Sequence, residues 1–325
     1  MTTLYGTDAP EDFYGTDGQD YIAGYGGDDY IVGYASYDQL FGGAGSDTVF
    51  AGDFDDSVEG GSGDDIIFGG SSDFGNDVIW GDSSADYSLS GYDDIYAGGG
   101  NDVVFGGAGK DVIGGGSGND TLYGGVPGSN AGDVSTEASG NWGDDQIFGG
   151  GGADDIGTTS GNDTVFGGSG DDLLFDSGGY NLLGGGSGND RIISYGGGTI
   201  YGGSGNDTIE AHGGTNTIWG GTGIDVIVNS DAYGSNDVDV FAFDYNHSYY
   251  GADSVFGFES GEDLIDLSYY DRNGDGYGDL TTSDVAFDYR TDLSDSTYAV
   301  TDVHFNGEVV RVYADAYLSG GDIYV

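Results

Sequence analysis

The stretch Gly202–Glu210 reads GGSGNDTIE, and segments of the same length and pattern recur along most of the chain. Close copies are GGAGSDTVF at 42–50, GGSGDDIIF at 60–68, GGSGNDTLY at 115–123, GGSGDDLLF at 167–175, GGSGNDRII at 185–193 and GGTGIDVIV at 220–228. The shared pattern is GGxGxDxUx, where U is apolar. Because it repeats every nine residues, we expect a repeat protein in which each short unit stacks on its neighbours.

The pattern divides each unit into a turn and a strand. Glycine at the first, second and fourth places accepts positive φ and close backbone approach, so six residues can turn tightly with converging carbonyl groups. The last three residues form a short strand whose middle side chain points to one face, and two units make one coil. We expect these middle residues to be buried: Val49, Ile67, Leu122, Leu174, Ile192, Ile209 and Ile227.

The composition points to bound cations. The 325 residues include 58 acids and 5 bases, giving a formal charge of -53, with 71 Gly and no Cys. Such a charge opposes compaction unless counter-ions are held in the fold, and it argues against binding to nucleic acid or to an anionic membrane. The acids are 51 Asp and only 7 Glu. The short Asp side chain suits tight turns and is a hard oxygen ligand for calcium.

The nonapeptide resembles the calcium-binding repeat of the RTX family, also called the hemolysin-type repeat. The resemblance implies an all-β fold, a right-handed parallel β-roll in which each calcium lies between turns of successive coils on the same edge. Its ligands there are backbone carbonyls and the carboxylates of the sixth-position Asp. About 22 units between Gly15 and Phe241 give about 11 coils. At roughly 4.8 Å per coil, the roll would be on the order of 50 Å long.

The resemblance assigns the calcium ligands to the sixth place of each unit. The matching residues are Asp20, Asp29, Asp38, Asp47, Asp56, Asp65, Asp77, Asp94, Asp102, Asp111, Asp120, Asp145, Asp154, Asp163, Asp172, Asp190, Asp207, Asp225 and Asp237.

Glycine-rich units alternate with poorer ones. After Gly167 the poorer units lack the sixth-position Asp, and Asn181 and Asn216 stand in two of those places. Because alternate units lie on opposite edges, we expect a regular calcium row on one edge and a sparse row on the other. The glycine-rich edge of the first half would be opposite that of the second, with the switch between Ala97 and Tyr123.

The nonapeptides stop after about Phe241, which divides the chain into the start of the roll at 1–14, the roll at 15–241 and a C-terminal β-rich cap at 242–325. Gly251–Asp271 resembles the segment that follows the repeats in RTX proteases and other type I secretion substrates. A cap would cover the apolar end and the unpaired backbone of the last coil. The final residues Asp322–Val325 resemble the secretion signal of that group, and no N-terminal signal peptide follows Met1.

A separate motif lies in the C-terminal part. DRNGDGYGD at 271–279 resembles the start of an EF-hand loop, with Asp271, Asn273 and Asp275 at its first, third and fifth positions. Thr282 stands where a bidentate acid is expected. The segment is therefore either a further calcium site or an Asx-rich surface turn.

Motifs for catalysis are missing from the sequence. His212, His247 and His304 form no recognisable zinc-ligand spacing, and no G-x-S-x-G elbow occurs. Adjacent acids such as Asp64 and Asp65 are explained far better as calcium-ligating turn acids than as a glycosidase pair. We therefore predict that the chain is not an enzyme. No run of 18 apolar residues predicts a membrane span.

Aromatic residues recur at the ninth place of the units. If that place faces outward, they form ladders that favour self-association or stacking on a glycan. They are Phe41, Phe50, Phe68, Trp80, Phe105, Tyr123, Phe148, Phe166, Phe175, Tyr201 and Trp219.

These observations favour a secreted, calcium-binding structural protein of the bacterial cell surface, part of an S-layer, sheath, filament or biofilm matrix. It would fold on calcium binding after type I export. The absence of Cys fits an extracellular protein that needs no disulfides. Expected partners are calcium, the type I secretion machinery, and further copies of the chain or a cell-surface polysaccharide. The alternatives are a glycan- or ice-binding roll, although its Thr residues are too scattered for an ice-binding row, and an accessory module of a uronate-polymer lyase or epimerase.

Overall fold

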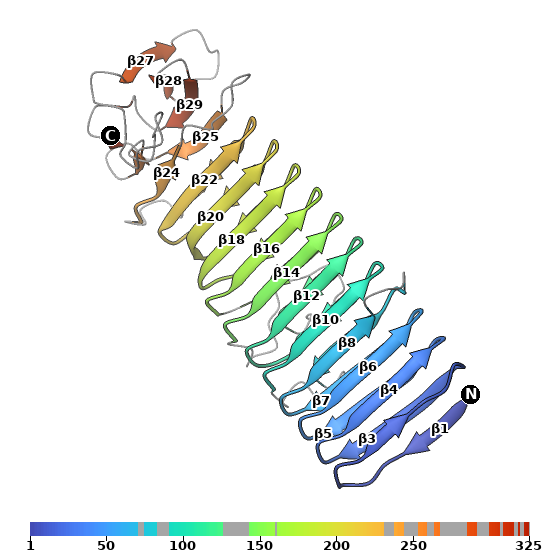
Figure 1. Cartoon of the computed structure of the whole chain (residues 1–325). Helices are drawn as coiled ribbons and strands as arrows, with labels where there is room; N and C mark the ends of the chain where they lie inside the picture. The colour runs from blue at the N-terminus through green and yellow to red at the C-terminus, as the bar shows by residue number, and fades with distance from the viewer. Residues whose placement is uncertain are drawn as a thin grey trace, which may run out of the picture. The chain divides into compact units, whose positions relative to one another are not determined.

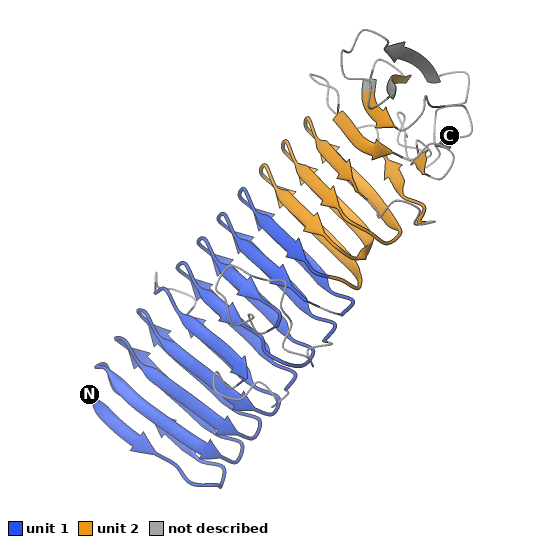
Figure 2. Ribbon diagram, turned by 180° about the vertical axis from the view of Figure 1, so that it is seen from behind, with its two compact units in different colours: residues 1–177 blue, residues 178–325 orange. Residues whose placement is uncertain are grey.

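The computed structural model describes residues 1–70, 75–82, 91–125, 143–159, 161–230, 237–243, 253–258, 263–266, 285–290, 299–305, 308–314, 318 and 322–324. These residues form strands and turns, and none of them is in a helix. The chain divides into two compact units, unit 1 at 1–177 and unit 2 at 178–325 (Figure 2). The predicted domain boundaries at 14/15 and 241/242 stay predictions.

In unit 1, successive strands alternate between two parallel sheets, so that each coil gives one strand to each sheet (Figure 1). The odd sheet contains, in spatial order, β1 (Thr2–Tyr5), β3 (Asp20–Gly26), β5 (Gln39–Ala44), β7 (Ser57–Ser62), β9 (Val78–Asp82), β11 (Val103–Phe105), β13 (Thr121–Tyr123), β15 (Asp155–Thr158) and β17 (Leu173–Asp176). The even sheet contains β2 (Asp12–Tyr14), β4 (Tyr30–Ala35), β6 (Thr48–Asp53), β8 (Ile66–Gly70), β10 (Asp94–Gly99), β12 (Val112–Ser117), β14 (Gln146–Gly151) and β16 (Thr164–Ser169).

Unit 2 begins with the same parallel arrangement and ends in a different one. Its even sheet contains β18 (Tyr180–Ser187), β20 (Gly197–Ser204), β22 (Asn216–Thr222), β24 (Val240–Ala242), β26 (Leu264–Asp266) and β30 (Ile323–Tyr324). Its odd sheet contains β19 (Arg191–Ser194), β21 (Thr208–Ala211), β23 (Val226–Asn229), β25 (Asp253–Phe258), β29 (Glu308–Ala314), β28 (Ala299–Phe305) and β27 (Val285–Arg290). Strand β28 is antiparallel to both β27 and β29, whereas β29 is parallel to β25.

The two units together confirm the predicted all-β solenoid. Two strands per coil from β2 to β23 amount to about 11 coils. Parallel pairing also continues beyond the last nonapeptide, because β25 pairs with β23 and β26 pairs with β24. The coil geometry therefore does not require the full glycine-rich motif.

The core of each unit is a row of apolar side chains from the eighth places. The predicted core residues Val49, Ile67, Leu122, Leu174, Ile192, Ile209 and Ile227 are all 1% exposed or less. Pairing in register stacks like on like, as with Ile67 against Ile95 and Ile209 against Ile227. The seventh and ninth residues of the same strands point outward, as the period of two requires. Each coil therefore adds only two large apolar side chains to the core.

Candidate metal centres along the turns

The turns form two edges in each unit, and we name them by the strands into which they lead. Turns of the odd edge lead into odd-numbered strands, and turns of the even edge lead into even-numbered strands. All predicted sixth-position aspartates other than Asp94 and Asp237 are buried in these turns, with at most 2% exposed. In unit 1, both edges carry a buried Asp at turn after turn. In unit 1, glycine-rich and glycine-poor units alternate as predicted, but the sixth-position carboxylates are present in both kinds of unit.

Two predicted ligands are in the wrong register. Asp93 is buried at the sixth place, whereas Asp94 begins β10 and is partly exposed. Likewise Asp239 is buried and Asp237 is partly exposed. Both errors arise in units that are longer than nine residues, where counting forward from the first-place residue does not reach the correct acid. Counting back two residues from the buried apolar side chain, Ile95 or Phe241, finds the correct acid.

Each sixth-position carboxylate is tied to the preceding coil through its Oδ1 atom. The backbone N–H of Asp47 donates to Oδ1 of Asp65, and the N–H of Asp65 donates to Oδ1 of Asp93, at 2.8 and 2.9 Å. We call these rows the sixth-position ladders. In unit 1 they join Asp20, Asp38, Asp56, Asp77, Asp102, Asp120, Asp154 and Asp172 on the odd edge, and Asp29, Asp47, Asp65, Asp93, Asp111, Asp145 and Asp163 on the even edge.

In unit 2 the sixth-position ladders extend past the nonapeptides. On the odd edge, N–H groups of Asp190, Asp207 and Asp225 donate to the Oδ1 atoms of Asp207, Asp225 and Asp253. On the even edge, Asp239 N–H donates to Oδ1 of Asp263. The motif search missed Asp253 and Asp263, because their turns lack the glycine signature.

Fifth-position side chains form a second ladder that runs in the opposite direction. The N–H of Asn101 donates to Oδ1 of Asn76, and the N–H of Asn119 donates to Oδ1 of Asn101, at 2.8 and 2.7 Å. In unit 2 the N–H of Asn206 donates to Oδ1 of Asn189 at 2.9 Å. This contact explains the recurring Asn or Asp before the sixth-position Asp, a signal that was present in the repeats but had no assigned role. Each turn is therefore tied to both of its neighbours by short polar side chains.

The other carboxylate oxygen, Oδ2, lies against the first-position glycine of its own unit. A Cβ atom on Gly42 would overlap Oδ2 of Asp47, and one on Gly60 would overlap Oδ2 of Asp65. In both aspartates this oxygen is buried and accepts no hydrogen bond. A buried, ionised oxygen without a donor is unfavourable unless a cation lies beside it. The glycine is thus required to make room for the carboxylate.

Main-chain carbonyl groups of one turn lie against the glycines of the turn in the next coil. Gly43 and Gly45 have φ of 117° and 135°, and their carbonyl oxygens lie where a Cβ on Gly61 or Gly63 would be. Hard carboxylate and carbonyl oxygens are the ligands that calcium prefers. The described residues contain no group of three or more His, Cys, Asp or Glu placed to hold a metal. Oxygen atoms of this kind are therefore present in the described turns, and their role as calcium ligands stays a prediction.

The pKa values of the carboxyls reflect the same environment. Burial, with smaller contributions from neighbouring carboxylates such as Asp93, raises the pKa of Asp65 to about 9. Burial and the charge of Asp145 raise the pKa of Asp111 to about 9. Asp20 differs, because hydrogen bonds from Thr16 and Thr2 outweigh its burial and lower its pKa. Burial thus disfavours the ionised form of these carboxyls, most strongly in Asp65 and Asp111.

The remaining predicted features lie in the C-terminal part. Asp271, Asn273 and Asp275, the EF-hand-like positions, lie outside the described residues. Of the predicted secretion signal, Asp322 is 2% exposed and Ile323 pairs with Ile265 as part of β30. Arg311 and Asp302 form an ion pair between β29 and β28, with Nε to Oδ1 at 2.7 Å.

Replacing a second-position glycine tests the carbonyl cradle. We expect Gly61→Ala to destabilise the calcium-loaded protein by about 2–5 kcal/mol, since the methyl group meets the Gly43 carbonyl at positive φ. Thermal unfolding followed by circular dichroism measures the effect. Ser62→Ala, in the same turn but with a partly exposed side chain, is the matched control. Equal melting temperatures for the two variants would contradict the cradle.

Comparison with known proteins identifies the repeat family. A family model described as the RTX calcium-binding nonapeptide repeat (4 copies) matches residues 5–40, 41–73, 72–91, 87–122, 138–156, 157–192 and 192–227. No curated protein matches the chain. Among solved structures, a hyperactive, Ca2+-dependent, beta-helical antifreeze protein from an Antarctic bacterium is similar, with 20% identity and a TM-score of 0.34. That match covers 82% of this chain and 86% of the other.

Proposed function

Because the chain belongs to the family of RTX calcium-binding nonapeptide repeats, which bind calcium in multiple copies, we propose that it is an exported structural protein of the bacterial cell surface. In this proposal the chain leaves the cell by type I secretion, folds on external calcium, and assembles with other copies into an S-layer, sheath, filament or biofilm matrix. None of the described residues forms a helix that is long and apolar enough to span a membrane.

The observation that carries the proposal is the separation of charge from apolar surface. On the even sheet of unit 1, the outward seventh and ninth places of eight strands hold two acids, Asp12 and Asp94, among 16 residues. Most of the other acids lie in the turns. The face also exposes large apolar side chains, including 40% of Ile66 and 44% of Tyr96. A protein with this net charge can therefore present a nearly neutral, aromatic face to a second copy.

The aromatic side chains on this face stack on one another. Phe50 and Phe68 have ring centroids 4.9 Å apart and ring planes 11° apart, and Phe68 and Tyr96 stack at 5.4 Å and 15°. Their spacing follows the strand spacing, so the ring faces are covered by neighbouring rings and the ring edges point outward. A sugar ring stacks on an exposed aromatic face. This arrangement therefore favours protein–protein packing over the glycan-binding alternative.

The size of the face indicates what kind of assembly it supports. Eight strands about 4.8 Å apart and about 10 Å of strand length give about 400 Å² per copy. Two such faces would bury about 800 Å², below the roughly 1,200 Å² of a stable pair. We therefore expect weak individual contacts that become effective when repeated, as in a lattice or filament, and not a tight dimer.

Electron microscopy with sedimentation velocity tests this assembly. The calcium-loaded chain is expected to form ordered multimers as its concentration rises. The variant Phe50→Ser/Phe68→Ser/Tyr96→Ser should remain as single particles with an unchanged β signal, because these side chains lie outside the buried core. Thr48→Ser/Gln146→Ser, on the same face, is the control and should assemble normally. Strictly single wild-type particles at high concentration, or normal assembly of the triple variant, would overturn the proposal.

A further inference from the structure

The even edge of unit 2 departs from the calcium-type turn. Two of its sixth places hold Asn181 and Asn216 in place of aspartate, and both residues are buried at 3% exposed or less. On the odd edge of the same unit, Asp190, Asp207 and Asp225 form an uninterrupted sixth-position ladder. The two edges of unit 2 therefore differ in charge while sharing one set of coils.

The asparagine side chains donate hydrogen bonds to the oxygens of their own turns. Nδ2 of Asn216 donates to the carbonyl oxygens of Gly213 and Gly214, both at 3.1 Å. Nδ2 of Asn181 donates to the carbonyl oxygen of Gly178 at 3.1 Å. A carboxylate at the same place has no donor and leaves such oxygens to a cation. In these turns the amide N–H groups of Asn181 and Asn216 donate to the carbonyl oxygens that a cation would otherwise contact.

A third asparagine acts on carboxylates directly. Asn229 is the last residue of β23 and holds the first place of its unit. In units such as Gly42–Phe50 this place is a glycine that faces the Oδ2 atom of the sixth-position Asp. Its Nδ2 donates to Oδ2 of Asp239 at 2.8 Å and to Oδ2 of Asp263 at 3.4 Å. These two acids are buried members of the sixth-position ladder on this edge. An amide donor therefore faces these Oδ2 atoms, whereas a glycine faces the Oδ2 atom in units such as Gly42–Phe50.

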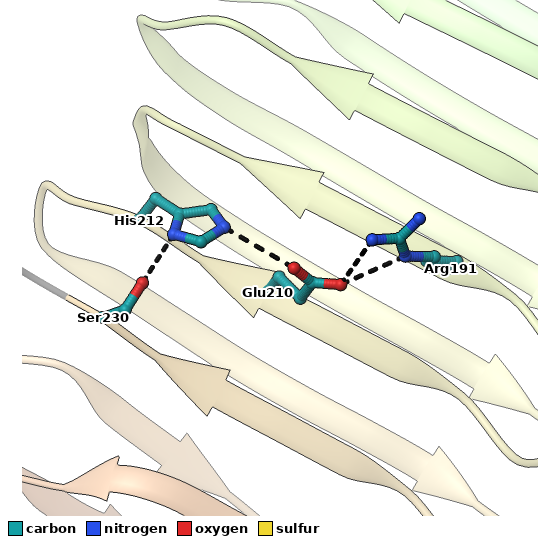
Figure 3. Close-up of polar contacts among 4 residues, drawn as sticks. All are labelled: Arg191, Glu210, His212 and Ser230. Carbon is teal, nitrogen blue, oxygen red and sulfur yellow. Dashed lines mark hydrogen bonds and ion pairs between the residues drawn. The ribbon is translucent and has the colours of Figure 1, made fainter.

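A chain of polar side chains runs from the odd sheet of unit 2 to this edge (Figure 3), with Arg191 and Glu210 on strands and His212 and Ser230 in the turns that follow β21 and β23. Arg191 on β19 bonds to Oε1 of Glu210 on β21 through Nη2 at 2.8 Å. His212 lies 3.7 Å from Glu210 through Nε2, and its Nδ1 is 2.5 Å from Oγ of Ser230, just after β23. These contacts link side chains of successive coils.

We propose that the even edge of unit 2 is closed without calcium, with the side-chain amides of Asn181, Asn216 and Asn229 in the role that the cation has on the odd edge. The contact between His212 and Ser230 joins two successive turns of the same edge. Unit 2 then has one calcium-dependent and one calcium-independent edge. This inference concerns the metal sites of the chain and does not rest on the proposed surface assembly.

Hydrogen exchange of the full chain tests the inference at saturating calcium and at a lower calcium level that still retains the β signal. In the wild type, amides at 212–218 should exchange equally slowly at both levels. Amides at 203–209 and 221–227 on the odd edge should exchange about tenfold faster at the lower level. Loss of protection at 212–218 in parallel with the odd edge would overturn the inference, and this wild-type comparison needs no variant.

Two matched variants identify the amide as the cause. Asn216→Asp replaces the N–H donor by a carboxylate, so protection at 212–218 should become calcium-dependent, again by about tenfold. Asn206→Asp makes the same charge change at a fifth place, where only an acceptor oxygen is used, toward Ile224 N–H. It should leave 212–218 unchanged. If Asn216→Asp behaves like Asn206→Asp, the amide does not have the proposed role.

Discussion

Removing calcium at neutral pH is expected to convert the folded chain into a largely unstructured one. The ladder carboxylates are buried in rows, and Oδ2 atoms such as those of Asp47 and Asp65 accept no hydrogen bond. Without a cation, desolvation and mutual repulsion of these groups oppose folding, and the formal charge of -53 adds to the repulsion. Circular dichroism during addition of EGTA should show loss of the β signal and its return at about millimolar calcium.

Two controls separate ligation from simple charge screening. Potassium chloride screens exposed charges, but it reaches buried carboxylates much less, so it should restore little of the β signal. Magnesium keeps its water molecules and demands octahedral geometry, so it should be a poor substitute for calcium. A spectrum that does not change when calcium is removed would contradict metal-dependent folding.

In calcium-free solution, acidification is expected to restore folded structure. The folded-state pKa is raised to about 6 in Asp38 and Asp47, to about 7 in Asp163 and Asp207, and to about 9 in Asp65 and Asp111, mainly by burial. The unfolded value is roughly 3.9. Between these values the folded state binds more protons than the unfolded state. The stability that these groups contribute is therefore fully present below roughly pH 3.9 and is lost as pH rises through the folded-state values, about 6 to about 9.

The measurement is a pH titration from about pH 8 to about pH 5 of protein freed of calcium on a chelating resin, because EGTA binds calcium weakly in acid. The β signal and the near-ultraviolet signal of the aromatic rows should both rise as pH falls. With calcium present the sign reverses, since protons compete with calcium for the carboxylates. A calcium-free chain that becomes less folded on acidification would contradict the raised pKa values.

Much of this architecture is predictable from short-range pattern. The period of nine residues identifies the turn, the strand and the eighth-place core residue, and the structure agrees from Val49 through Ile227. The pattern works because each coil contacts only its neighbours, so one unit carries the information for all units. The outward direction of the ninth-place aromatics follows from the same alternation.

The features that the pattern misses depend on partners distant in sequence. Asp94 and Asp237 are the wrong choices because each of these longer units offers a second acid within two residues, Asp93 and Asp239. The pairing of β10 with β8 and of β24 with β22 fixes the register. Asp253 is recognised by a hydrogen bond from Asp225, 28 residues earlier. The role of Asn229 depends on Asp263, 34 residues later. No local motif marks these residues.

The sixth-position ladders also bear on how such a chain can change its length. The bonded aspartates are usually 18 residues apart, but they are 28 apart for Asp65 and Asp93 and 34 apart for Asp111 and Asp145, with the same contact. Sequence added between the first and sixth places of a turn therefore leaves the pairing on both sides intact. Removing a whole coil keeps each edge in phase, whereas removing a single nonapeptide would move every later turn to the opposite edge. Units can therefore be gained or lost only in pairs, whereas the length of a turn can change without altering the edge on which any later turn lies.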